Sequence, residues 1–151
     1  TSINSSPAIA DIDEDGMNEV VFGTEDGRIT ALNHLGEVMW SVDVPGSIRA
    51  TPLLHDIDDD TLSETIVGDT SGSLYIIGAR GEVKQEIELD AGIEATPAIL
   101  DETFIIGCHD GTIRRMDGED ELWRYATRDT IVAPIVVTDL YRNEDQTILA
   151  G

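Results

Sequence analysis

The sequence predicts an all-β fold made of repeated four-stranded units. Three observations favour this fold class. Prolines at 7, 52, 97 and 134 open successive repeats, at intervals of 45, 45 and 37 residues. Each repeat continues with an acidic turn and an apolar run that ends in glycine, and no ten-residue stretch keeps the 3.6-residue period of a helix. Four short strands in a repeat of about 40–45 residues are typical of a β-propeller blade.

The strands of one blade follow from the pattern of each repeat. Residues 7–10 and 20–23 are short and continuously apolar, as expected for inner strands that are covered on both faces. A second glycine, four residues after the first, precedes a third strand at residues 28–33. The fourth strand is clearest in the second repeat, where Val83, Gln85, Ile87 and Leu89 alternate with Lys84, Glu86 and Glu88, and the first repeat places Val38, Trp40, Val42 and Val44 on the corresponding face.

The repeats predict four blades in one propeller domain, at about residues 5–45, 50–90, 95–128 and 132–151. The first three supply four antiparallel strands each, and the fourth supplies two, so we expect three full blades, a partial fourth and an incomplete ring. Exposed strand edges invite pairing with another chain. We therefore expect the remaining blades of a larger propeller, or a second copy of the chain, to cover the open edge.

The turn between the first two strands has the spacing of a calcium loop. Residues 11–19 place side-chain oxygens at loop positions 1, 3, 5 and 9, with Gly16 at position 6. An EF-hand would need a helix on each side and a Glu at position 12, but that position is Phe22 and both flanks are strands. The pattern therefore predicts a metal loop within a β-hairpin.

The charge balance excludes some partners. The chain has 31 acidic residues against 9 Lys and Arg, a formal net charge of -22, and Lys84 is the only lysine. Nucleic acid and anionic lipid are therefore poor partners, and no apolar run is long enough for membrane insertion. Dense carboxylates with almost no lysine resemble the proteins of a salt-loving archaeon. The single cysteine, Cys108, lies beside an apolar run and is interpreted as a small buried hydrophobe.

Two stretches resemble known propeller repeats. Residues 6–23, with the pattern Asp11-x-Asp13-x-Asp15-Gly16-x-x-Glu19, resemble the FG-GAP repeat of integrin-type propellers. The continuation through residues 27–40 resembles the repeat of quinoprotein-like (PQQ-like) propellers. Such propellers serve as adhesion domains, assembly scaffolds, dehydrogenases and polysaccharide lyases, so the resemblance implies the fold more closely than the activity.

The FG-GAP resemblance implies two Ca²⁺ sites and their ligands. The ligands would be Asp11, Asp13, Asp15, the Met17 carbonyl and Glu19 in the first repeat, and Asp56, Asp58, Asp60, the Leu62 carbonyl and Glu64 in the second. Thr61 replaces the turn glycine, which makes the second turn costlier and its site weaker. The third repeat has only the tight turn Asp101-Glu102, where no metal is expected, and the fourth keeps Asp139 and Asn143 in an imperfect loop. The alternative is that all of these are ordinary acidic turns.

Two function classes remain open, and behind them stands a third, a sensor or scaffold module attached to another domain. The first is a non-catalytic, calcium-binding module for surface interaction or assembly, with a protein or carbohydrate partner, outside the cell or at its surface. It is favoured because His34, His55 and His109 fall in different connections of different repeats and do not converge. The alternative is a fragment of a propeller enzyme, a quinoprotein-like dehydrogenase or a polysaccharide lyase, whose active site lies outside this segment. Trp40 and Trp123, at equivalent fourth-strand positions, are interpreted as packing between blades.

Overall fold

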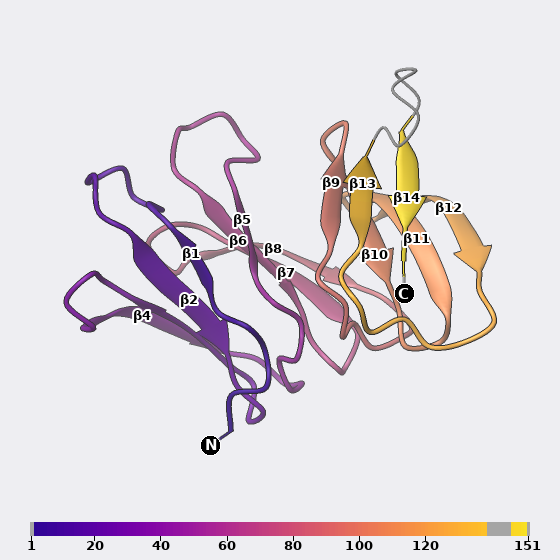
Figure 1. The fold of residues 1–151 in the computed structure, drawn as a ribbon, viewed down its shortest axis with the longest axis horizontal. Helices are drawn as coiled ribbons and strands as arrows, with labels where there is room; N and C mark the ends of the chain where they lie inside the picture. Colours follow the sequence, from indigo (N-terminus) through magenta and orange to yellow (C-terminus); the bar gives the residue numbers. More distant parts are fainter. Residues whose placement is uncertain (1, 139–145, 151) are drawn as a thin grey trace.

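The computed structural model describes residues 2–138 and 146–150 (Figure 1). All regular elements in this part of the chain are β-strands, arranged in three four-stranded sheets and one two-stranded sheet. The first sheet contains β1 (Ala8–Ala10), β2 (Glu19–Gly23), β3 (Arg28–Leu32) and β4 (Val38–Asp43), and the second contains β5 (Leu53–His55), β6 (Glu64–Gly68), β7 (Ser73–Ile77) and β8 (Val83–Glu88). The third contains β9 (Ala98–Leu100), β10 (Thr103–Gly107), β11 (Thr112–Asp117) and β12 (Asp120–Ala126), and the fourth contains β13 (Val136–Thr138) and β14 (Thr147–Leu149).

Each sheet is one propeller blade. Its strands pair antiparallel with their neighbours in sequence, and the first strand of one blade lies beside the first strand of another, β1 beside β5 and β9 beside β13. The blades follow one another from the indigo end to the yellow end of the molecule without closing a ring among the described residues (Figure 1). The predicted fold class, with three full blades and a partial fourth, is confirmed.

The apolar core lies between the blades. The first cluster joins Val21 and Trp40 of the first blade to Val67 and Tyr75 of the second. The second cluster joins the second and third blades, and includes the predicted buried Cys108. The third joins the third blade to the β13–β14 hairpin. Because each blade buries its face against the next, a blade gains its apolar stabilisation from its neighbours, as in other repeat proteins.

Close packing against an isoleucine explains why the apolar runs of the first three blades end in glycine. Gly68 closes β6, and the fully buried Ile93 from the loop leaving the second blade packs directly on it. A Cβ atom at position 68 would lie 2.2 Å from Ile93 Cγ2, which leaves no room for a side chain. The equivalent pairs, Gly23 with Ile48 and Gly107 with Ile131, repeat this contact.

Trp40 forms a joint between the first two blades. Its side chain is buried, and its indole Nε1–H donates a hydrogen bond of 2.9 Å to the Ala79 carbonyl oxygen. The strand register places Trp123 at the same position of the third blade, opposite Arg115 as Trp40 is opposite Ala31. Trp123 is half-buried, and it lines a shallow pocket with Ile113 and Ile148. Packing between blades, predicted for both residues, is confirmed for Trp40, and the partly buried Trp123 packs against the third cluster with Val137 and Ile148.

A β-bulge changes the predicted facing of the fourth strands. Leu32 pairs with Val38 and Ala31 with Trp40, so Met39 is an extra residue in β4. Lys84 and Leu122 are the extra residues of β8 and β12. The bulge shifts the predicted alternation only at the start of each strand: Val38 and Val83, expected on the packed face, are 64% and 48% exposed, while Trp40 and Ile87 lie on that face as predicted. That part of the prediction is wrong, because simple alternation cannot accommodate an unpaired residue.

The adjacent arginines of β11 occupy different environments. Arg114 is 2% exposed and forms ion pairs with Asp110 and, across the blade junction, with Asp90. Arg115 is partly exposed and pairs with Asp101. Arg114 is thus the buried residue of the two, and the carboxylates of Asp110, Asp90 and Glu121 compensate the desolvation of its charge.

We predict that Trp40→Ala destabilises the chain by about 3–5 kcal/mol, because it opens a cavity between two blades and removes a buried hydrogen bond. Trp40→Phe keeps a six-membered aromatic ring but loses the Nε1 hydrogen bond, so it should lower the free energy of unfolding by about 1 kcal/mol. Urea unfolding measures both values. Trp123→Ala is the matched variant at the equivalent position. A loss of stability as large as that of Trp40→Ala would contradict the assignment of the inter-blade contact to Trp40.

Candidate metal site

The two acidic loops lie at the same place in their blades. The first connects β1 to β2 and the second connects β5 to β6, at the end of each hairpin. Ala10 pairs with Glu19, and His55 pairs with Glu64, so each loop ends on a glutamate that begins the second strand. The predicted ligands therefore belong to hairpin loops, as the sequence indicates.

Both loops share a frame of hydrogen bonds to their own carboxylates. The Gly16 N–H donates to Asp11 Oδ2 at 2.9 Å, and the Thr61 N–H donates to Asp56 Oδ2 at the same distance. The turn residues both have positive φ, 88° at Gly16 and 78° at Thr61. A threonine in this region is strained, so the costlier turn predicted for the second loop is confirmed.

In the first loop, three aspartates converge. Carboxylate oxygens of Asp11, Asp13 and Asp15 lie within 4.8 Å of one another, a set that could hold a metal ion. Glu19 is not part of this set, although it lies close behind the loop: its Oε2 accepts a hydrogen bond of 3.0 Å from the Ile12 N–H. The participation of Glu19 and of the Met17 carbonyl in coordination stays a prediction.

Glu19 is a carboxylate in an unfavourable environment. It is 1% exposed. Burial raises the pKa of its carboxyl group, the Ile12 N–H opposes that shift, and the charges of Asp13, Asp15 and Asp11 add to it. Ionised Glu19 therefore costs folding free energy above its unfolded pKa unless a cation compensates it.

Asp11 has an oxygen that hydrogen bonds within the chain do not satisfy. Its Oδ1 atom is buried and has no hydrogen-bond partner, whereas the corresponding oxygen of Asp56 accepts the Asp60 N–H at 3.2 Å. A buried unpaired carboxylate oxygen is costly, and a bound cation would satisfy it. The residues present in the first loop therefore fit a divalent ion with oxygen ligands, the preference of Ca²⁺.

The second loop contains a cation of its own. Oxygens of Asp56, Asp58 and Glu64 lie within 4.8 Å of one another. The Lys84 ammonium nitrogen lies 2.7 Å from Glu64 Oε1, 2.9 Å from Asp58 Oδ2 and 3.7 Å from Asp60 Oδ2. The hydrogen bond to Glu64, followed by that to Asp58, raises the pKa of Lys84, and the same lysine lowers the pKa of Asp58. This contact was not predicted from the sequence, although Lys84 is the only lysine and follows the loop by one strand pair.

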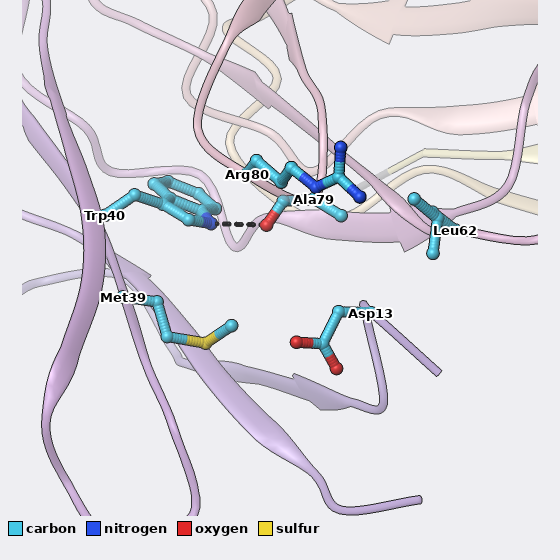
Figure 2. A pocket seen from close by; sticks show the side chains of 6 residues that line it. All are labelled: Asp13, Met39, Trp40, Leu62, Ala79 and Arg80. Atoms are coloured by element: carbon cyan, nitrogen blue, oxygen red, sulfur yellow. Dashed lines mark hydrogen bonds between the residues drawn. The ribbon is translucent and has the colours of Figure 1, made fainter. Parts of the chain in front are cut away.

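Lys84 has no cationic counterpart in the first blade. The equivalent residue is Met39, which lines a pocket with Asp13, Trp40, Ala79, Arg80 and Leu62. Figure 2 shows the Met39 side chain and the Asp13 carboxylate on the same side of this pocket, with the Trp40–Ala79 hydrogen bond across from them. Asp13 of the first loop thus shares a pocket with an uncharged thioether and with Arg80 of the second blade, whereas Asp58 and Glu64 of the second loop contact an ammonium group directly.

The third and fourth repeats differ from the first two. Asp101 and Glu102 form the predicted tight turn, both with positive φ, between the paired residues Leu100 and Thr103. Asp139 and Asn143 of the fourth repeat lie outside the described residues, so the interpretation of that loop stays a prediction.

Within the described part of the chain, no residue belongs to a helix that could cross a membrane.

Solved structures show which fold the chain shares. BamB from Moraxella catarrhalis superposes with a TM-score of 0.70 at 26% identity, over 98% of this chain and 44% of that one. Sqt1 from Saccharomyces cerevisiae has a TM-score of 0.77 at 17% identity, over 97% and 44%. BBS1N, in a crystal structure of its complex with ARL6DN, has a TM-score of 0.72 at 13% identity, over 99% and 51%.

These neighbours share a propeller-like fold with the chain. No protein-family model and no curated protein sequence matches it. The chain spans about half the length of BamB, Sqt1 and BBS1N. The FG-GAP resemblance rests on the sequence pattern alone. The β-propeller-like fold that it implies is present in the described residues, as an open series of blades.

Proposed function

We propose that the chain is a calcium-stabilised segment of a β-propeller that serves in protein interaction or assembly, as an FG-GAP-like module. The observation that carries the calcium assignment is the buried, unpaired Asp11 Oδ1 within a group of three converging aspartates. A divalent ion there would offset the mutual repulsion of the carboxylates and fix the hairpin turn. Its role would be structural, because the ion would stabilise the connection between two strands.

The assembly role rests on the open end of the blade series. Trp40 is covered by the next blade, while the equivalent Trp123 is only half-buried beside a two-stranded sheet. An apolar face next to unpaired strand edges favours association with further β-structure. The remaining blades of a larger propeller are the proposed occupant, and propeller-fold neighbours in complexes support a protein partner.

The proposed environment follows from charge and calcium together. Calcium modules outside the cell bind at about 0.1–1 mM, the range in which a loop with few protein ligands is filled. An extracellular or cell-surface location therefore fits the first loop. The net charge of -22 fits a salt-rich medium, in which counterions screen the repulsion between surface carboxylates.

We predict that calcium raises the melting temperature of the wild-type chain and that Asp13→Ala removes most of this gain. Deleting one of three converging carboxylates should weaken calcium binding about tenfold, because affinity follows the number and charge of the ligands. Asp58→Ala is the matched variant in the second loop and should affect calcium binding less. Titration calorimetry that detects no calcium binding to the wild-type chain at about 1 mM would contradict the site.

The Glu19→Gln variant separates the charge repulsion between Glu19 and the aspartates from the role of Glu19 as a calcium ligand. In chelator, this variant should be more stable than the wild type at neutral pH, because a neutral amide replaces a buried charge that faces three aspartates. With calcium, the difference should shrink or reverse. Equal stability of the two proteins in chelator would show that the carboxylates do not repel one another as described.

Salt should stabilise the chain strongly. We expect the melting temperature to rise between low and molar KCl, since the repulsion among exposed carboxylates is screened over about 8–10 Å at ordinary ionic strength. Chelator must be present throughout so that calcium does not contribute. A flat or falling melting temperature would contradict a halophilic origin.

The isolated chain should associate through its open end. Light scattering is expected to show a mass that grows with concentration above the monomer mass of 16.4 kDa, and Trp123→Ser should reduce this association. Ile3→Ser is a suitable control, because Ile3 is also exposed but belongs to the N-terminal segment. A stable monomer up to millimolar concentration, unaffected by either variant, would contradict the proposed role of this face.

A further inference from the structure

We infer that the Lys84 ammonium group is the cation of the second acidic loop, where it takes the place that a divalent ion would occupy in the first. For the first loop this inference rests on the proposed calcium site. It assigns different requirements to two loops that share their spacing, most of their hydrogen bonds and the positive φ of their turn residues. One loop takes its cation from the solvent, and the other takes it from its own blade.

The position of Lys84 on the bulge makes this contact possible. Lys84 is the unpaired residue of β8, between Val83, which pairs with Ile77, and Gln85, which pairs with Ile76. An unpaired residue on a bulged strand is re-aimed relative to the regular alternation. Its side chain reaches the loop of the same blade across the sheet and contacts Glu64 and Asp58.

The contacts of Lys84 match the geometry of a cation inside the carboxylate group. Its nitrogen lies 2.7 Å from Glu64, whose side chain is fully buried, and 2.9 Å from Asp58. These two residues belong to the set whose oxygens lie within 4.8 Å of one another. An ion at the centre of this set would have to displace the ammonium group and leave the charge of Lys84 near a second cation, which opposes binding.

The first blade provides the natural comparison. Met39 is the unpaired bulge residue of β4, as Lys84 is of β8, and its side chain carries no charge. Glu19, the counterpart of Glu64, is equally buried, yet it accepts a hydrogen bond from the Ile12 N–H without a cationic side chain beside it among the described residues. One residue on the fourth strand thus distinguishes a loop that requires an external ion from a loop that does not.

Reciprocal variants test this inference. We would prepare Lys84→Met, Met39→Lys and the double variant, count bound Ca²⁺ by native mass spectrometry, and measure melting in chelator at low salt. The expected counts are one ion for the wild type, two for Lys84→Met, none for Met39→Lys and one for the double variant. In chelator, Met39→Lys should raise the melting temperature by roughly 3 °C and Lys84→Met should lower it by a similar amount. Lys84→Arg keeps the charge and should keep the count of the wild type.

The outcomes separate this inference from the calcium proposal. A wild-type chain that binds no calcium refutes the proposed calcium function, while the opposite shifts of Lys84→Met and Met39→Lys in chelator still support the role of Lys84. The inference is overturned if the wild type already binds an ion that Asp58→Ala removes. It is also overturned if Lys84→Met neither gains an ion nor melts at a lower temperature. Should Lys84→Met fail to fold, Met39→Lys decides, because unchanged calcium binding and melting in that variant refute the inference.

Discussion

Repulsion between carboxylates held at the ends of two hairpins is the constraint to which this structure responds most visibly. Three or four acids within a few ångströms repel one another at neutral pH, and a positive charge beside them offsets that repulsion. The second blade supplies that charge through Lys84, which contacts Glu64 and Asp58 directly. The first blade has Met39 at that position and keeps a buried, unpaired oxygen on Asp11. The same loop geometry therefore imposes two different chemical requirements.

The loops matter to the whole chain because the blades depend on one another. The apolar clusters cross from each blade to the next, and the joints include the Trp40–Ala79 hydrogen bond and the Asp90–Arg114 ion pair. A blade whose first hairpin is strained transmits that cost to its neighbour, since neither can bury its face alone. A cation in one loop would thus contribute to the stability of a series of blades, which is the physical basis of the structural role proposed for calcium.

The sequence predicted the features that a repeat makes periodic. The four repeats, the order of the strands, the tight turn at Asp101-Glu102 and the equivalence of Trp40 and Trp123 follow from spacing alone, and the structure shows each of them. The bulges were not predictable in this way, because a single unpaired residue leaves no mark in an alternating pattern. Without the bulge, Val83 is expected to face inward and the place of Lys84 beside the loop is hidden. The loop residues were predictable from the sequence. The contact between Lys84 and the second loop was not, because it depends on the register of β8, which places Lys84 twenty residues after Glu64 in the chain.

Hydrogen exchange of the two loops, measured with and without calcium, distinguishes a loop that binds an external ion from a loop held by its own lysine. Exchange at amides of residues 11–19 should slow markedly when calcium is added to the chelator-treated chain, because the ion fixes the turn around Asp11. Exchange at residues 56–64 should already be slow in chelator and should change little, because Lys84 holds that loop. Equal responses of both loops to calcium, or no response of the first, would contradict an account in which one loop binds its cation from solution and the other contains its own.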